Sequence, residues 1–133
     1  MHNLEKEVII PNGGVKPLAP YSPGIRLGDL VFTSGQIGID PQTGILVPGG
    51  VLKETRQALN NLTQILEAAG SSLKHVVKVT VYLKDIQDYG RVNQVYAEFF
   101  THKPPARAII QGDLPMGATV ELDAIAVVAG EGS

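Results

Sequence analysis

Cysteine is absent from the 133 residues of this chain, and its absence excludes several kinds of chemistry. Without a thiol the chain can form no disulfide and has no thiolate nucleophile. It also has no cysteine ligand for a zinc ribbon or an iron–sulfur cluster. Any active site must therefore be built from the nitrogen and oxygen groups of other side chains.

A large excess of either charge is missing as well. The formal net charge is -2 at pH 7 and the pI is about 5.9, unlike the basic surface that neutralises many phosphates. A nucleic-acid partner is therefore not expected. With 44% hydrophobic and 18% charged residues the chain can bury a core. Its length is typical of one domain, so we expect a single domain over residues 1–133.

Long apolar runs are missing too. The run that begins at Val8 is too short for the core of a signal peptide. No other stretch approaches the length of a membrane-spanning helix. We therefore expect a soluble cytoplasmic protein without a membrane partner.

Motifs for metals and nucleotides are also lacking. The glycine pairs Gly13-Gly14 and Gly49-Gly50 are not followed by the Gly-Lys-Ser/Thr of a phosphate-binding loop, and no GxGxxG motif opens a helix. The three histidines have no partners at metal-binding spacing, so no metal site is expected at His2, His75 or His102.

Alternation and turn chemistry predict six strands. The dipeptide Gly28-Asp29 is typical of a hairpin between two of them. The expected strands are Val8–Ile10, Gly24–Leu27, Leu30–Ile37, Val76–Lys84, Ala106–Gln111 and Thr119–Ala129.

Two segments have helical periodicity instead. The first begins at Val51 and ends at Gly70, a residue favoured just after a helix. The second follows Asp85, a suitable N-cap, and ends before Lys103-Pro104-Pro105. The expected apolar stripes are Leu52, Thr55, Leu59, Leu62, Leu66 and Ala69 in the first helix, and Tyr89, Val92, Tyr96, Phe99 and Phe100 in the second. The order β-β-β-α-β-α-β-β predicts an α+β fold.

The last strand also bears on assembly. Its second half is apolar on both faces, with Ala124 and Ala126 on one face and Ile125 and Val127 on the other. Both faces should therefore be buried. Two helices can cover only one face of the sheet, so we expect the other face to lie in an interface between copies of the chain.

Two charged residues are candidates for a small-molecule site. Arg107 begins an apolar strand, and its planar guanidinium suits a carboxylate. Glu121 is the first of few charges on its strand and could position a water molecule. From composition and spacing alone, the preferred interpretation is that the two residues form a structural ion pair with each other or with surface groups. Ser34 lacks the GxSxG context of a serine hydrolase.

Five motifs that occur in a fixed order along the chain favour a functional site over a structural ion pair. They are Ala19–Gly24 (APYSPG), Val31–Ile37 (VFTSGQI), Val92–Tyr96 (VNQVY) with Phe99 and Phe100, Pro104–Arg107 (PPAR) and Val120–Ala126 (VELDAIA). Together they resemble the RidA/YjgF family of enamine/imine deaminases, also called the L-PSP endoribonuclease family. The resemblance covers about Ala19 to Val128.

The resemblance implies a chorismate-mutase-like two-layer fold and a homotrimer with active sites in clefts between subunits. It implies hydrolysis of reactive enamines or 2-imino acids to 2-oxo acids and ammonia without a cofactor. Arg107 matches the arginine that binds the substrate carboxylate, and Glu121 matches the acid that positions water. The other matched site positions are Tyr21, Ser34, Gly35, Asn93 and Ile109.

The sequence departs from the family pattern at two places. Ile109 stands where many active members have cysteine, which changes the polarity of the pocket. The stretch from Arg107 to Glu121 is one residue shorter than in typical members, which could remove a bulge. Two other functions stay open: a non-catalytic protein that binds small carboxylates or regulates a partner, and, as the lowest-ranked, an endoribonuclease or translation inhibitor.

Overall fold

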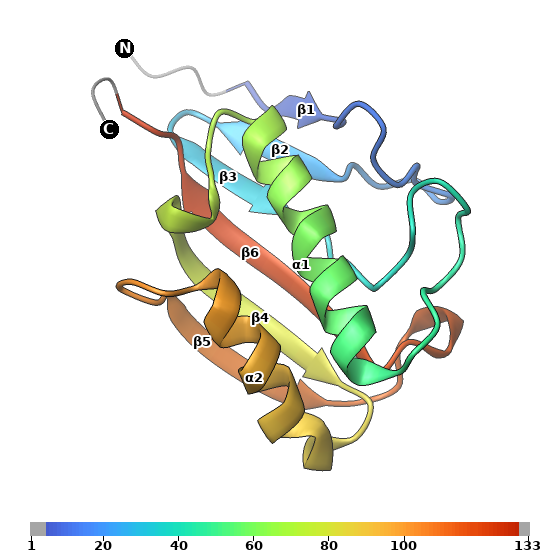
Figure 1. Cartoon of the computed structure of the whole chain (residues 1–133). Coiled ribbons are helices and arrows are strands. Elements are labelled where there is room, and N and C mark those ends of the chain that lie inside the picture. The colour runs from blue at the N-terminus through green and yellow to red at the C-terminus, as the bar shows by residue number, and fades with distance from the viewer. Residues whose placement is uncertain (1–4, 131–133) are drawn as a thin grey trace.

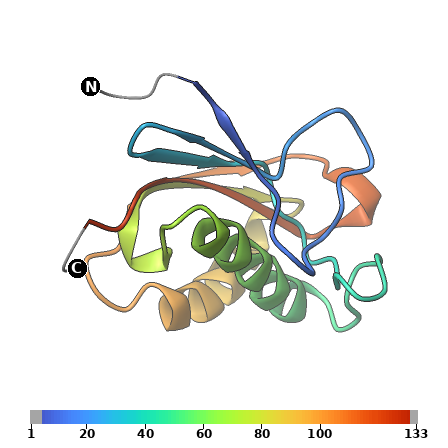
Figure 2. The same cartoon turned by 90° about the horizontal axis from the view of Figure 1, so that it is seen from above.

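The structure, a computed structural model, describes residues 5–130 and has one sheet with two helices on one of its faces (Figures 1 and 2). The order of elements along the chain is the predicted β-β-β-α-β-α-β-β. The strands are β1 (Glu7–Ile9), β2 (Gly24–Leu27), β3 (Leu30–Thr33), β4 (Val76–Leu83), β5 (Ala106–Gln111) and β6 (Val120–Val127). The helices are α1 (Val51–Ala68) and α2 (Tyr89–Phe99), with short 3-10 turns η1 (Leu73–His75), η2 (Ile86–Asp88) and η3 (Pro115–Gly117).

The sheet places the last strand near its middle. Its order is β1-β2-β3-β6-β4-β5, so β6 joins the N-terminal hairpin to the β4–β5 pair (Figure 1). β4 and β5 are parallel and the other neighbours are antiparallel. The α+β class predicted from the sequence is confirmed.

Helix α1 supplies much of the core. Leu59, Leu62 and Leu66 are fully buried against the sheet, and each such side chain contributes about 1.5–3 kcal/mol through burial. The helix ends as predicted: Gly70 has φ +83°, and the amide of the following Ser71 donates to the carbonyl of Leu66 at 2.8 Å. This pair of features is the Schellman arrangement, in which a residue with positive φ ends the helix.

Some predicted apolar positions are wrong. Leu52 is 38% exposed, while its neighbour Val51 is buried; adjacent helix residues point about 100° apart, so only one of them can face the core. Tyr89 is 45% exposed, because its ring lies beside Arg107 rather than in the core. Asp85 caps η2, by accepting a hydrogen bond from the Gln87 amide at 2.9 Å, and α2 begins only at Tyr89.

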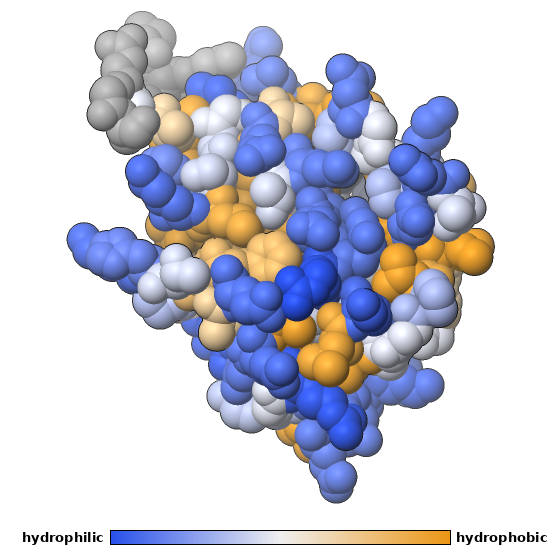
Figure 3. All heavy atoms as spheres, in the orientation of Figure 1, coloured by the Kyte–Doolittle hydropathy of each residue, from blue (hydrophilic) through white to orange (hydrophobic). Residues whose placement is uncertain are grey.

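The sheet face opposite the helices is open in the single chain (Figure 2). It carries Phe32, which is 37% exposed, and Ile110, which is 50% exposed, together with the partly exposed Ile125 and Val127. The helix side, by contrast, is mostly hydrophilic with separate apolar patches (Figure 3). Burial of both faces of β6 therefore stays a prediction that needs a second copy of the chain.

Within residues 5–130, no helix is both long and apolar enough to cross a membrane.

Candidate active site

An irregularity between β3 and β6 creates one half of the site. The Thr33 hydroxyl oxygen accepts a hydrogen bond from the Ala124 amide at 3.0 Å, which takes the place of a backbone partner. Regular pairing stops there, although the sequence predicted strand as far as Ile37. Gln36 then exchanges two backbone hydrogen bonds with Leu122, at 2.8 and 3.0 Å. The intervening residues Ser34 and Gly35 lie outside the ladder.

Gly35 lies directly against the carboxylate of Glu121. A Cβ atom on Gly35 would overlap Oε2 of Glu121 and would lie 2.8 Å from its Cδ. The close approach of this carboxylate favours glycine here, since any larger residue would displace it. The backbone conformation of Gly35 does not demand glycine, because its φ is not positive. The family resemblance implied that Gly35 and Glu121 share one site, and in the structure the two residues are adjacent.

Glu121 opens onto a cavity of about 950 Å³. We call it the Glu121 cavity, and the lining residues used below are Tyr21, Ser34, Gly35, Gln36, Met116 and Glu121. The Ser34 hydroxyl donates to the carbonyl of Ser22 at 2.5 Å. The hydroxyl proton of Ser34 is therefore already used in a hydrogen bond, and only the lone pairs of the hydroxyl oxygen can bind a ligand.

The environment of Glu121 favours its protonated form. Burial raises the pKa of the Glu121 carboxyl, and the nearby charge of Asp123 raises this pKa further. Burial also raises the pKa of Asp123, against the smaller effect of the hydrogen bond that the Tyr82 hydroxyl donates to it at 3.1 Å. A carboxyl whose pKa is raised returns a proton less readily to water and is a stronger proton acceptor than an exposed glutamate.

The second half of the site is centred on Arg107. Its Nη1 donates to Oδ1 of Asn93 at 2.8 Å and its Nη2 donates to the hydroxyl of Tyr89 at 3.2 Å. We call Tyr89, Asn93 and Arg107 the Arg107 cluster. The guanidinium has no acidic partner within residues 5–130. Of its roughly five donor hydrogens, about three therefore remain for a ligand.

A core residue supports the guanidinium. The ring centroid of Tyr96 lies 4.8 Å from Cζ of Arg107, within the range of a cation–π contact. The same ring packs against the ring of Phe100, with the two centroids 4.5 Å apart. Tyr96 is only 7% exposed, and this burial raises the pKa of its hydroxyl. The charge of Arg107 lowers the same pKa, but its effect is smaller than that of burial. The hydroxyl is buried without a hydrogen-bond partner in the described range.

The two halves do not meet within one chain. Arg107 is in register with Val79, which faces the helices, whereas Glu121 is in register with Tyr82. Successive strand residues point to opposite faces, so Val79 and Tyr82, and with them Arg107 and Glu121, lie on opposite faces of the sheet. The interpretation in which Arg107 and Glu121 form an ion pair with each other within one chain is therefore wrong.

The other predicted positions divide accordingly. Tyr21, Ser34 and Gly35 join Glu121 at the cavity, and Asn93 joins Arg107. Ile109 points to the same face as Arg107, opposite Val81, and packs against the core. The β4–β5 ladder runs in register from Ala106 to Gln111 without a bulge.

Sequence reasoning missed two groups that position the site. Glu54 is 6% exposed, and its Oε1 accepts from the Thr119 amide at 2.9 Å, two residues before Glu121. Asn61 donates to the carbonyls of Ile37 and Ile39 at 3.2 and 2.8 Å and so fixes the loop beyond Gln36. A signal for Glu54 existed, because it lies three residues after Val51 and four before Ala58, which is the spacing of a buried helix face.

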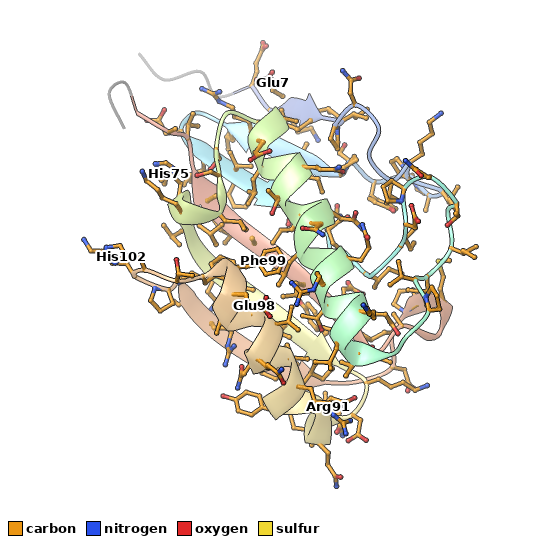
Figure 4. The ribbon with its side chains drawn as sticks, viewed as in Figure 1. Glu7, His75, Arg91, Glu98, Phe99 and His102 are labelled. Carbon is orange, nitrogen blue, oxygen red and sulfur yellow. The ribbon has the colours of Figure 1, made fainter. Side chains whose placement is uncertain are left out.

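Residues 5–130 contain no group of three or more histidine or acidic side chains that could hold a metal ion. His75 lies in η1 and His102 in the loop between α2 and β5 (Figure 4); His75 Nδ1 is hydrogen-bonded to the Ser72 hydroxyl at 2.8 Å. His2 lies outside the described residues.

The fold and the two half-sites define a two-layer α+β protein with a cationic cluster on one face of its sheet and an acidic cavity on the other. Residues 13–128 match the family model described as Endoribonuclease L-PSP. The chain therefore belongs to the RidA/YjgF family, also called the L-PSP family, with its chorismate-mutase-like fold.

Several relatives match over nearly their full length. A RutC family protein of Pyrococcus horikoshii is 49% identical over 91% of this chain and 97% of its own. The mouse (Mus musculus) protein named 2-iminobutanoate/2-iminopropanoate deaminase is 44% identical over 96% of this chain and 95% of its own. The crystal structure of Escherichia coli TdcF with bound serine is 38% identical, covers 92% of this chain and 99% of its own, and has a TM-score of 0.86.

Proposed function

We propose that this protein hydrolyses 2-imino acids, and the enamines from which they form, to 2-oxo acids and ammonia. The observation that carries the proposal is the guanidinium of Arg107, which has no acidic partner within residues 5–130 and is held in place by Asn93 and Tyr89. Such a group is suited to bidentate capture of a small carboxylate. The name of the mouse relative supports the choice of substrate.

Glu121 supplies the second requirement, a positioned water molecule. The oxygen of this water attacks the imine carbon, and the electron pair of the C=N bond moves to nitrogen. The Glu121 carboxylate takes a proton from the water and returns it to the nitrogen, which gives an amino alcohol. The same carboxylate then takes the proton of the new hydroxyl group and passes it to the nitrogen. The C–N bond breaks as the C=O bond of the 2-oxo acid forms, and ammonia leaves. Water is the only co-reactant, and the raised pKa of Glu121 suits a group that both accepts and returns a proton.

Both groups must act on one substrate. In a 2-imino acid the carboxylate is bonded directly to the reacting carbon, about 1.5 Å away. Arg107 and Glu121 of one chain lie on opposite faces of the sheet and cannot converge on such a molecule. The site is therefore completed between copies, with the Arg107 cluster of one copy facing the Glu121 cavity of the next.

A homotrimer, as the family resemblance implies, meets this requirement. A closed ring gives every copy one neighbour on each side, and thus gives every site both halves. The open sheet face supports the proposal, because it exposes apolar side chains such as Phe32 and Ile110 that a second copy would cover. Light scattering in solution tests the stoichiometry directly.

The activity is tested with 2-iminobutanoate generated in the assay by an amino-acid oxidase. Release of 2-oxobutanoate is measured with wild type, Arg107→Ala and Arg56→Ala. Arg56 is a matched control, because it pairs with Glu98 at 3.0 Å, linking α1 to α2, and takes part in neither half-site. We expect Arg107→Ala to lose on the order of a hundredfold in rate, because the charge-assisted carboxylate contact is lost.

A wild-type rate equal to the spontaneous rate would refute the proposal. One observation favours a second function, because the TdcF relative is described with bound serine, which is a small carboxylate. If this chain binds 2-oxo acids tightly and turns over no imine, it is a carboxylate-binding protein that uses the same residues.

A further inference from the structure

The two side chains that accept hydrogen bonds from Arg107 differ in what they can still do. Asn93 is on the second turn of α2, and Tyr89 is the first residue of that helix. The Tyr89 hydroxyl lies 3.2 Å from Nη2, and its ring centroid lies 5.6 Å from Cζ of Arg107. Tyr89 is 45% exposed, so its hydroxyl is accessible at the mouth of the Arg107 cluster.

The hydrogen-bond count at this hydroxyl leaves one donor free. A phenol carries one proton and can accept through its oxygen lone pairs, whereas a guanidinium can only donate. The Tyr89 oxygen must therefore be the acceptor in its contact with Arg107, and its own proton points elsewhere. Within residues 5–130 this hydroxyl donates to no other group.

The same count applies to the amide of Asn93. Its Oδ1 is occupied by Nη1 of Arg107, which leaves its NH2 group to donate. The free polar hydrogens of the Arg107 cluster are therefore available as donors, and the cluster presents no anionic acceptor. Such an arrangement recognises an anion, and it repels no part of a carboxylate.

We propose that Tyr89 is a substrate-binding residue whose hydroxyl donates to the carboxylate that Arg107 binds. This inference rests on the proposed function for the identity of the ligand. Arg107 alone fixes the position of the carboxylate, and the phenol fixes its rotation by holding one oxygen. Tyr89 thereby sets which side of the imine carbon faces the Glu121 cavity of the neighbouring copy.

Arg56 provides the control. It pairs with Glu98 at 3.0 Å and takes part in neither half-site, so Arg56→Ala shows any loss of affinity that does not involve the Arg107 cluster. Tyr89→Phe keeps the aromatic ring and removes only the hydroxyl oxygen.

The experiment measures the dissociation constant of 2-oxobutanoate by calorimetry with the full-length protein. We expect Tyr89→Phe to weaken binding roughly tenfold, the effect of losing a hydrogen bond to a charged group. Arg56→Ala should stay within about twofold of wild type, because Arg56 pairs only with Glu98. In turnover, Tyr89→Phe should raise KM by a similar factor and change kcat much less, because the attack on carbon takes place at Glu121. Equal affinities for Tyr89→Phe and wild type would overturn the inference.

A double variant separates direct binding from mere positioning of the arginine. Arg107→Lys keeps a cation but removes the planar fork. If Tyr89 donates to the carboxylate itself, adding Tyr89→Phe to Arg107→Lys weakens binding further; no further loss shows a purely positional role and overturns the inference.

The failure of the proposed function would look different. If 2-oxobutanoate binds but no imine is turned over, the deaminase proposal fails and the comparison at Tyr89 still stands. If wild type turns over imines and Tyr89→Phe binds and reacts as wild type does, only the role of Tyr89 fails. If wild type does not bind 2-oxobutanoate at all, the carboxylate site and the role of Tyr89 fail together.

Discussion

Two inactive variants should restore activity when their chains are mixed. Arg107→Ala removes the carboxylate contact and Glu121→Gln removes the group that positions water, so each variant alone should fall on the order of a hundredfold below wild type. The two residues lie on opposite faces of one sheet. A site between copies can therefore take Arg107 from one variant and Glu121 from the other.

The geometry fixes the size of the recovery. In a closed ring each site draws one half from each of two neighbours. After equal and random mixing, the chance of an intact Arg107 is one half and the chance of an intact Glu121 is also one half. About one quarter of the sites are then intact, so the mixture should show about 25% of wild-type activity per site. As the ratio of the two chains varies, the activity should follow a parabola with its maximum at equal amounts.

The assay needs exchange of copies, achieved by unfolding the two variants together and refolding them. Mass spectrometry of chains with different tags establishes that mixed oligomers have formed. Variants mixed without refolding serve as the control and should remain inactive. Mixed oligomers that stay as inactive as either parent would refute a site shared between copies.

The remaining predictions concern how the Glu121 half-site is held. Gly35→Ala should fold yet lose about a hundredfold in deamination rate, because its Cβ displaces the Glu121 carboxylate by roughly 1 Å; circular dichroism and the imine assay check both parts. Glu54→Ala should lower the free energy of unfolding in urea by about 1–3 kcal/mol, since the partly buried Thr119 amide loses its acceptor, and Glu54→Gln should cost less. The pKa of Glu121 is raised above its usual 4.5, so the folded state holds its proton more tightly and stability falls as pH rises through that window. Urea unfolding of Glu121→Gln should therefore show a smaller fall between acidic and neutral pH, and an identical pH dependence would contradict the assignment.

The fold was largely predictable from the sequence, for reasons that are local. Alternation along Val76–Leu83 and the three-and-four spacing of Leu59, Leu62 and Leu66 each report a period that one element imposes by itself. Gly70 also follows a local rule, because only a residue that tolerates a positive φ ends the helix in this way. These signals required no knowledge of neighbouring elements.

The placement of the site was not predictable in the same way. Whether Arg107 and Glu121 share a face depends on the register of β4 with both β5 and β6, and register is a property of paired strands rather than of either sequence alone. The roles of Glu54 and Asn61 were not predicted, because they depend on backbone partners far away in the chain. Helical spacing can indicate that Glu54 is buried, but not which group it binds.

The central position of β6 has a consequence for biosynthesis. The hairpin β2–β3 and the pair β4–β5 are joined only through β6, so the two halves of the sheet cannot join until β6 has been made. Pairing across the middle of the sheet is thus deferred until all other strands exist, which slows folding and exposes open strand edges meanwhile. Because the same strand carries Glu121, a nascent chain acquires a continuous sheet and its water-positioning carboxylate in one event.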